Sequence, residues 1–140
     1  GWQGDLLGAR AASERCAELW PGYAFCFHNL SALALREGQL DEARRQALKA
    51  QQRAPSNIYT YLALGDAAQA AGLYAEAEKH FAQGMVVAPG QHKARMGYAV
   101  ALFEQGKLRY AEAQLADMAE LNELQGRGRG QRFSRRSETS

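Results

Sequence analysis

Residues 24–57 read AFCFHNLSALALREGQLDEARRQALKAQQRAPSN, and this stretch decides the fold. Apolar residues recur with helical spacing up to Gly38, and again between Gly38 and Pro55. Glycine ends the first helix because it adopts a left-handed backbone freely. Proline ends the second because it has no backbone N–H to donate. The stretch therefore predicts two helices joined by a tight turn.

The same helix-ending glycine and proline residues recur along the chain with a period of 34 residues. Glycine stands at Gly4, Gly38, Gly72 and Gly106, and proline at Pro21, Pro55 and Pro89. A repeat of this length is typical of stacked helical units rather than of a single globular core. The period predicts helices over residues 7–20, 24–37, 41–54, 58–71, 75–88, 92–105 and 109–122.

Small residues occupy two fixed positions of the repeat, where helices of a pair must approach closely. One position is always alanine, and the other holds serine, glycine or alanine. They are Ala9, Ala43, Ala77 and Ala111, and Ser31, Gly65 and Ala99. Larger apolar residues lie between them, so the pattern predicts interdigitating helix pairs.

This pattern resembles the tetratricopeptide repeat (TPR) family. In residues 24–57 the resemblance rests on Asn29-Leu30, Gly38, Asp41-Glu42-Ala43, Ala50 and Pro55. In residues 58–91 it rests on Leu64-Gly65, Gly72, Tyr74, Glu76-Ala77, Phe81 and Pro89. The third unit is degenerate, with Arg95 in place of the aromatic residue and Glu123 in place of the proline.

The resemblance implies an all-α fold, a right-handed superhelical solenoid of antiparallel helix pairs with about three and a half TPR units. The expected array covers residues 1–125. It divides into a half unit, 1–23, and three units, 24–57, 58–91 and 92–125. Because the chain begins partway through a repeat, we expect it to be a fragment of something longer.

The resemblance also implies that the first helices of successive units line a concave groove that binds a peptide or partner helix. The candidate partner-binding residues in this register are Phe25, His28, Arg36, Tyr59, Leu62, Asp66, Lys93, Met96 and Phe103. Exposed apolar groups rimmed by charge mark a binding site. An alternative stays open for Phe25, Leu35 and Phe103, which could instead pack against neighbouring helices.

Some family members use cationic and amide side chains in the groove to clamp the C-terminal carboxylate of heat-shock chaperones. The matching positions here are His28, Ala32, Ala63, Lys93 and Gly97. Only Lys93 keeps the required chemistry, because a carboxylate needs several converging cationic donors. We therefore expect no such clamp in this chain.

Both ends of the predicted array are open. The last helix offers Leu115, Met118 and Leu121 with no further full helix to cover them, and residues 7–20 lack their own partner helix. Solenoids need polar caps because each unit buries its apolar face on the next. We expect these ends to contact further sequence, another domain or a second copy, and we predict concentration-dependent self-association.

Residues 126–140, GRGRGQRFSRRSETS, form an arginine- and glycine-rich tail that is expected to be disordered. Its arginines are Arg127, Arg129, Arg132, Arg135 and Arg136. With Glu138 as the one acid, five positive charges against one negative charge give +4, so the rest of the chain carries −2 of the net +2. The Arg-Gly pattern makes an RNA-associated protein an alternative, but nucleic acid is not the expected partner.

The sequence offers no pattern for chemistry. His28, His80 and His92 have no metal-binding spacing, and no phosphate loop or nucleophile–base pair is present, so neither a metal, a cofactor nor catalysis is expected. Cys16 and Cys26 are expected to be free packing residues, although one bridge between them stays open. No apolar run is long enough for a membrane span.

The leading functional hypothesis is a protein–protein interaction module, an adaptor or assembly scaffold. The alternative is a regulatory or substrate-docking arm of a larger enzyme whose catalytic domain precedes residue 1. An RNA-associated protein that uses the basic tail is the second alternative.

Overall fold

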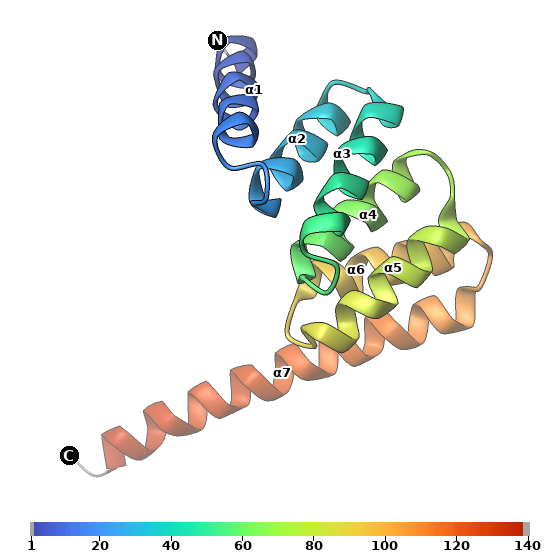
Figure 1. The fold of residues 1–140 in the computed structure, drawn as a ribbon. Helices are drawn as coiled ribbons and strands as arrows, with labels where there is room; N and C mark the ends of the chain where they lie inside the picture. The colour runs from blue at the N-terminus through green and yellow to red at the C-terminus, as the bar shows by residue number, and fades with distance from the viewer. Residues whose placement is uncertain (1, 139–140) are drawn as a thin grey trace.

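The computed structural model describes the backbone of residues 2–138 and the side chains of residues 4–124. This part of the chain contains seven α-helices and no strand. They are α1 (Trp2–Leu19), α2 (Ala24–Arg36), α3 (Leu40–Arg53), α4 (Ile58–Ala70), α5 (Tyr74–Val87), α6 (His92–Glu104) and α7 (Leu108–Glu138). The helices run antiparallel to their neighbours and stack into a curved array (Figure 1). The predicted all-α helical solenoid is confirmed.

Three glycines make the turns inside the helix pairs. Gly38, Gly72 and Gly106 have positive φ angles of 75°, 79° and 79°. The residue after each one donates its N–H to a carbonyl five residues earlier; Gln39 N lies 2.9 Å from the oxygen of Ala34. This hydrogen bond closes the end of the helix, and a side chain would oppose the backbone that it requires.

One cluster of buried apolar residues lies between α4, α5 and α6. The ring of Phe81 fills the space between Gly65 and Gly97, and Phe81 is 1% exposed. A Cβ atom at Gly65 would lie 2.7 Å from the ring, and one at Gly97 would lie 2.5 Å from it. The two glycines therefore leave the space that the large Phe81 side chain fills, and the interior is closely packed there.

The predicted small positions also bring helices together. Ala43, Ala77 and Ala111 are buried, and the buried Ser31 Oγ donates a hydrogen bond to the oxygen of Ala43 at 2.8 Å. Ala9 differs because it is exposed. Among the described helices α1 contacts only α2, so no second helix covers Ala9.

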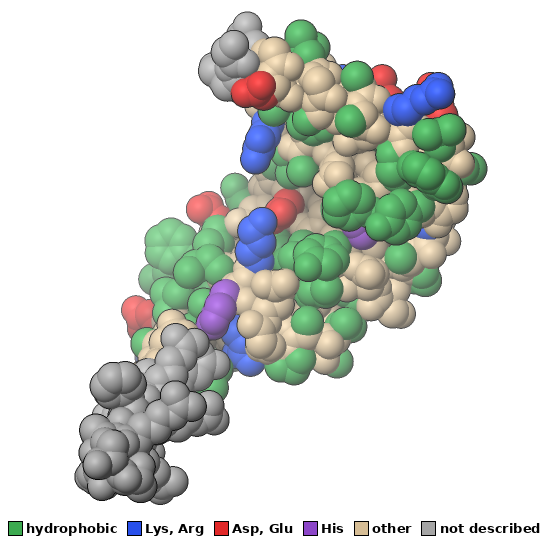
Figure 2. Space-filling view, turned by 90° about the vertical axis from the view of Figure 1, so that its left-hand side faces the viewer, with side chains coloured by type: hydrophobic (Ala, Val, Ile, Leu, Met, Phe, Trp, Pro, Cys, Tyr) green, Lys and Arg blue, Asp and Glu red, His purple; other side chains and the backbone are tan. Residues whose placement is uncertain are grey.

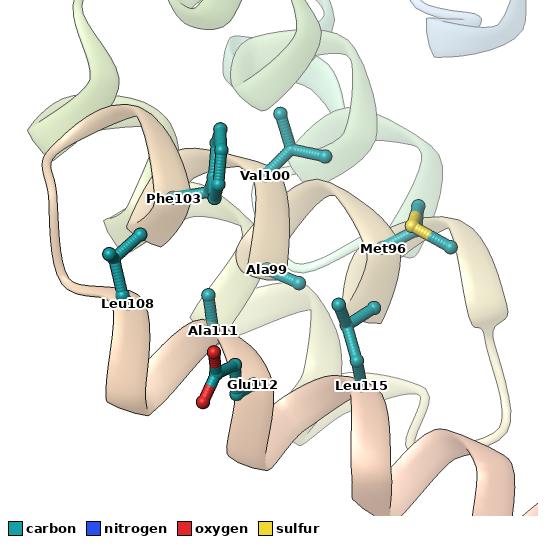
Figure 3. Close-up of a pocket in the computed structure, with 8 residues that line it drawn as sticks. All are labelled: Met96, Ala99, Val100, Phe103, Leu108, Ala111, Glu112 and Leu115. Atoms are coloured by element: carbon teal, nitrogen blue, oxygen red, sulfur yellow. The ribbon is translucent and has the colours of Figure 1, made fainter.

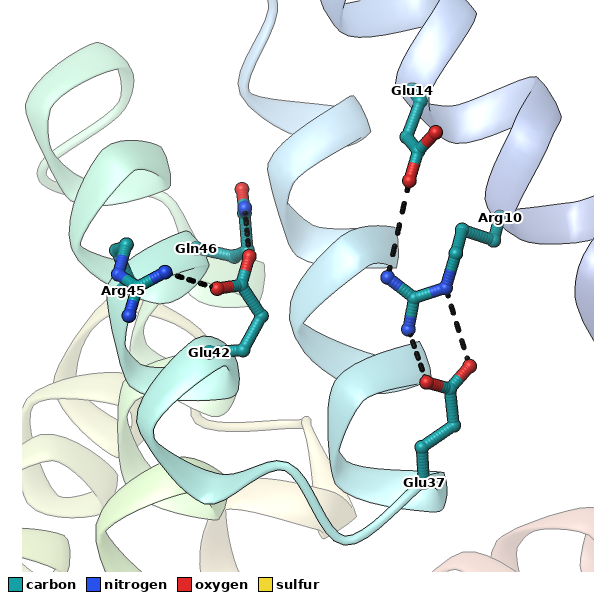
Figure 4. Close-up of polar contacts among 6 residues, drawn as sticks. All are labelled: Arg10, Glu14, Glu37, Glu42, Arg45 and Gln46. Atoms are coloured by element: carbon teal, nitrogen blue, oxygen red, sulfur yellow. Dashed lines mark hydrogen bonds and ion pairs between the residues drawn. The ribbon is translucent and has the colours of Figure 1, made fainter.

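Helix α1 is held to α2 by three kinds of contact. Cys16 and Cys26 form a disulfide, so the expectation of two free thiols is wrong. Cys16 lies near the end of α1 and Cys26 near the start of α2, and the short turn brings their Cα atoms within 5.7 Å. Arg10 makes a bidentate ion pair with Glu37, with Nη2–Oε2 and Nε–Oε1 distances of 2.5 and 3.3 Å (Figure 4). Ala17 packs on the apolar cluster of α2 and α3.

Helix α7 is longer than the sequence predicts. The expected end at residue 122 is wrong, because the backbone stays helical to Glu138. The physical reason is local: residues 109–138 contain no proline, and Glu123 stands where the preceding units have Pro55 and Pro89. Residues 126–138 of the expected disordered tail are thus helical in the backbone. Their side chains, including the five arginines, lie outside the described residues, and the division between array and tail stays a prediction.

Candidate partner-binding groove

The first helices of the three pairs, α2, α4 and α6, lie side by side. Helices α1 and α7 both extend to the left of this stack in the view of Figure 1. Figure 2 looks at the molecule from that direction. Hydrophobic side chains gather in the middle of this face, and only a few charged groups lie among them (Figure 2).

Most of the residues predicted for the groove are accessible on these three helices. Phe25, Arg36, Tyr59, Asp66, Lys93, Met96 and Phe103 are exposed, and His28 is half-buried. The exposure of Phe25 and Phe103 decides against the alternative that they pack inside the array. Leu35 does pack inside it, against a cluster of Ala34, Ala43 and Ala67.

The prediction that Leu62 is a groove residue is wrong, because only 7% of its surface is exposed. It belongs to the core around Phe81, together with Ala77 and Ala94 from the flanking helices. A partner cannot reach it without opening the array, so Leu62 is not a groove residue.

The centre of the face is built around the start of α4. The Asn57 side chain accepts a hydrogen bond from Tyr59 N at 2.8 Å and so caps the helix, which holds Tyr59 at the surface. The rings of His28 and Tyr59 have centroids 6.2 Å apart. His28 Nε2 is also 2.9 Å from Oγ1 of the buried Thr60. Burial lowers the pKa of His28, so its ring lies beside Tyr59 without adding a positive charge at pH 7.

Asp66 and Lys93 supply opposite charges on neighbouring helices of the same face. Desolvation by the surrounding protein raises the pKa of Asp66, and the nearby Lys93 lowers it in part. Water still reaches Asp66. A side chain can be accessible to water and yet lose much of its hydration, and that loss raises the pKa of Asp66.

We predict that Asp66→Asn makes the protein more stable at pH 7. Because the pKa of Asp66 is higher in the folded state than in the unfolded state, the carboxyl group disfavours folding once it is ionised. Its cost grows as the pH rises from the ordinary pKa of 3.8 through the raised value. Urea unfolding of both proteins at pH 7 and at about pH 3.5 measures the effect. The gain should be present at pH 7 and vanish at the lower pH.

Lys93→Met is the companion variant. It removes the positive charge that offsets the desolvation of Asp66, so it should lower stability at pH 7. In the Asp66→Asn background the same change should have a smaller effect. A loss of stability in Asp66→Asn at pH 7 would contradict this account of the site.

The structure adds one aromatic residue to the predicted face and shows a pocket at its end, where Met96 and Phe103 of the predicted groove set lie near Leu115 of the predicted open end. Tyr23 is exposed in the turn before α2, with its ring centroid 5.8 Å from that of Phe25, and it extends the aromatic surface.

At the opposite end of the face, an apolar pocket of about 250 Å³ lies between α6 and α7 (Figure 3). It is lined by Met96, Ala99, Val100, Phe103, Leu108, Ala111, Glu112 and Leu115. The repeat register marks these positions, since each has counterparts 34 and 68 residues earlier.

Two further properties concern chemistry and membranes. Among the side chains that the structure describes, no group of three His, Cys, Asp or Glu residues is arranged to hold a metal ion. Over the same part of the chain, none of the helices has the length and apolarity of a transmembrane segment.

No family model matches the sequence, and no curated protein matches it significantly. Solved structures do resemble it. MamA from Desulfovibrio magneticus RS-1 superposes with a TM-score of 0.77 at 17% identity, over 88% of this chain and 70% of that one. The TPR domain of Arabidopsis OM64 gives 0.65 at 22% identity, over 71% and 84%. The O-GlcNAc transferase of Thermobaculum terrenum gives 0.67 at 24% identity, over 71% of this chain and 19% of the transferase. The chain has the fold of tetratricopeptide repeat domains.

Proposed function

We propose that this chain is a protein–protein interaction module that binds a peptide or a partner helix in the groove formed by α2, α4 and α6. The module acts by presenting a surface. The partner-binding residues are those of the predicted set that are accessible, which leaves out Leu62.

One observation carries this proposal. Large apolar side chains from all three inner helices are exposed on one face, among them Phe25, Tyr59, Met96 and Phe103. A folded protein buries such groups where its own packing allows. Aromatic residues are also the side chains that contribute most to binding energy at interfaces. Asp66 and Lys93 lie on the same face and would set the orientation of a charged ligand, since complementary charges favour specificity.

A peptide selection tests the proposal. A displayed library of random peptides is selected on the purified protein, and the affinity of the enriched peptides is measured for the wild type and for Tyr59→Ala/Met96→Ala. We expect the double variant to bind about 10-fold or more weakly, because truncating a central interface anchor costs on the order of 1–2 kcal/mol.

The matched control is Val86→Ala on α5, since Val86 is 81% exposed and lies on an outer helix. It should leave the affinity unchanged. Equal affinity of the wild type and the double variant, at equal helicity, would contradict a groove at these residues.

A further inference from the structure

The pocket between α6 and α7 is the third copy of a surface that is covered twice within the same molecule. Its eight lining residues correspond, 34 residues earlier, to Leu62, Gly65, Asp66, Gln69, Tyr74, Ala77, Glu78 and Phe81. Helix α6 covers that earlier surface. The surface one further unit back, on α2 and α3, is covered by α4.

Exposure follows this coverage. Phe81 is 1% exposed under α6, whereas its counterpart Leu115 is 46% exposed. Leu62 is 7% exposed, whereas its counterpart Met96 is 48% exposed. Beyond Leu115, α7 continues as a single helix to Glu138, so the chain does not fold back over the pocket before that residue. The pocket thus has the shape of a helix-binding site without a helix in it.

Helix α6 shows what kind of helix such a surface binds. It places Ala94, Gly97 and Ala101 against the core of α4 and α5, so that the helices approach closely. Near its end, Gln105 Nε2 and Lys107 Nζ donate to Oε1 of Glu78, at 3.3 and 3.0 Å. The counterpart of Glu78 in the open pocket is Glu112, the one charged residue among the lining residues. A helix that fits there needs small residues in the same spacing and a donor for Glu112.

The outward face of α1 meets this requirement at two of the three small positions, with Gly4 and Ala11 in place of Ala94 and Ala101. Gly4, Leu7, Gly8, Ala11 and Arg15 are all exposed, and they have the spacing of Ala94, Gly97, Tyr98, Ala101 and Gln105. Where the two surfaces would meet, the pocket has a smaller side chain and the helix a larger one than in the contact between Phe81 and Gly97. Leu115 replaces the larger Phe81 in the pocket, and Leu7 replaces the smaller Gly97 on the helix. Arg15 takes the place of Gln105 as the donor.

The glycines of α1 support this inference independently. An added Cβ at Gly4 or Gly8 would meet nothing within 4 Å, whereas at Gly65 and Gly97 it would clash with Phe81. Glycine inside a helix is less favourable than alanine, because it loses more backbone freedom on folding. At Gly65 and Gly97 close packing explains that cost. At Gly4 and Gly8 no contact with the described residues does, and Leu7 between them is 68% exposed.

We propose that two copies of this chain associate head to tail, with the outward face of α1 of one copy bound in the α6–α7 pocket of the other. Leu7 enters the pocket beside Leu115, and Arg15 pairs with Glu112. Arg15 can make this exchange at little cost, because its pair with Glu18 at 3.6 Å is solvent-exposed. A head-to-tail interface leaves one free α1 and one free pocket, so it continues beyond a dimer. Met96 and Phe103 line both this pocket and the groove, so a second copy would compete with a peptide that reaches the third unit.

Sedimentation velocity of the purified chain tests the proposal over roughly 10 µM to 1 mM, the range suited to a small interface. The weight-average mass of the wild type should rise about two-fold or more. Leu7→Asp and Leu115→Asp should each stay monomeric, because either change places a charge in the apolar contact. Both residues are exposed in the monomer, so folding measured by circular dichroism should be unchanged. Val86→Asp, the matched control outside both surfaces, should associate like the wild type.

Mixing the two blocked variants gives the sharpest result. Leu7→Asp keeps an intact pocket and Leu115→Asp keeps an intact α1, so the mixture should form a dimer and stop there. Arg15→Glu should weaken association, and Glu112→Arg in the same chain should restore it. A wild type that is monomeric at 1 mM, a blocked variant that still associates, or a mixture that stays monomeric would each overturn the proposal. The groove proposal would survive any of these outcomes, because its test uses peptides and residues of α4 and α6.

Discussion

Phe81→Ala should lower the free energy of unfolding by about 3–5 kcal/mol, the range for a large aromatic side chain removed from a packed core. Phe81 is almost fully buried, and its ring touches both Gly65 and Gly97. Neither glycine has a side chain that could move into the vacated space, so the cavity would persist. Urea unfolding followed by circular dichroism measures the loss.

Val86→Ala in the same helix is the control, because Val86 is largely exposed and its truncation should change stability little. Gly97→Ala tests the same contact from the other side. Its added Cβ would lie 2.5 Å from the Phe81 ring, so it should destabilise the protein although alanine is the better helix former. In the Phe81→Ala background, Gly97→Ala should no longer be harmful. Persistence of its full cost there would show that the ring is not the cause.

Reducing the Cys16–Cys26 bond should release α1 from the array. The bond spans a sequence separation of 10 residues, and closing a loop of that length corresponds to roughly 2–3 kcal/mol of unfolded-state entropy. Since α1 contacts only α2 among the described helices, the loss falls on the docking of that helix. Limited trypsin digestion followed by mass spectrometry measures it as faster cleavage after Arg10 and Arg15 under reducing conditions.

The double variant Cys16→Ser/Cys26→Ser should behave like the reduced protein and should not respond to reductant. Cleavage after Arg109 in α7 is an internal reference and should keep its rate in both conditions. Equal protection of Arg10 and Arg15 with and without reductant would show that the ion pair to Glu37 and the packing of Ala17 suffice to hold α1.

Local features of the repeat could be predicted from the sequence because each has a local cause. Gly38, Gly72 and Gly106 end helices through their own backbone conformation, which depends on no distant residue. The buried alanines at Ala43, Ala77 and Ala111 follow from the repeat register, since a small residue at one position of every unit indicates close helix contact.

Two other features could not be predicted from the sequence, each for its own reason. The bond between Cys16 and Cys26 depends on the angle at which α1 meets α2, which no spacing of two cysteines specifies. The length of α7 was missed for a different reason. A fading repeat signal after Gly106 indicates that the pattern ends, but it does not indicate that the helix ends.

Leu62 and Met96 show what the sequence determines and what only the tertiary structure decides. They occupy the same position of successive units, and the sequence by itself determined the helices, the turns and this shared register. Only the tertiary structure decided that Leu62 is core and Met96 is surface, because α6 covers the one and no described helix covers the other. Burial belongs to the contact between two elements. A repeat position states which face a residue lies on, and the neighbouring helix decides whether that face is buried or open to a partner.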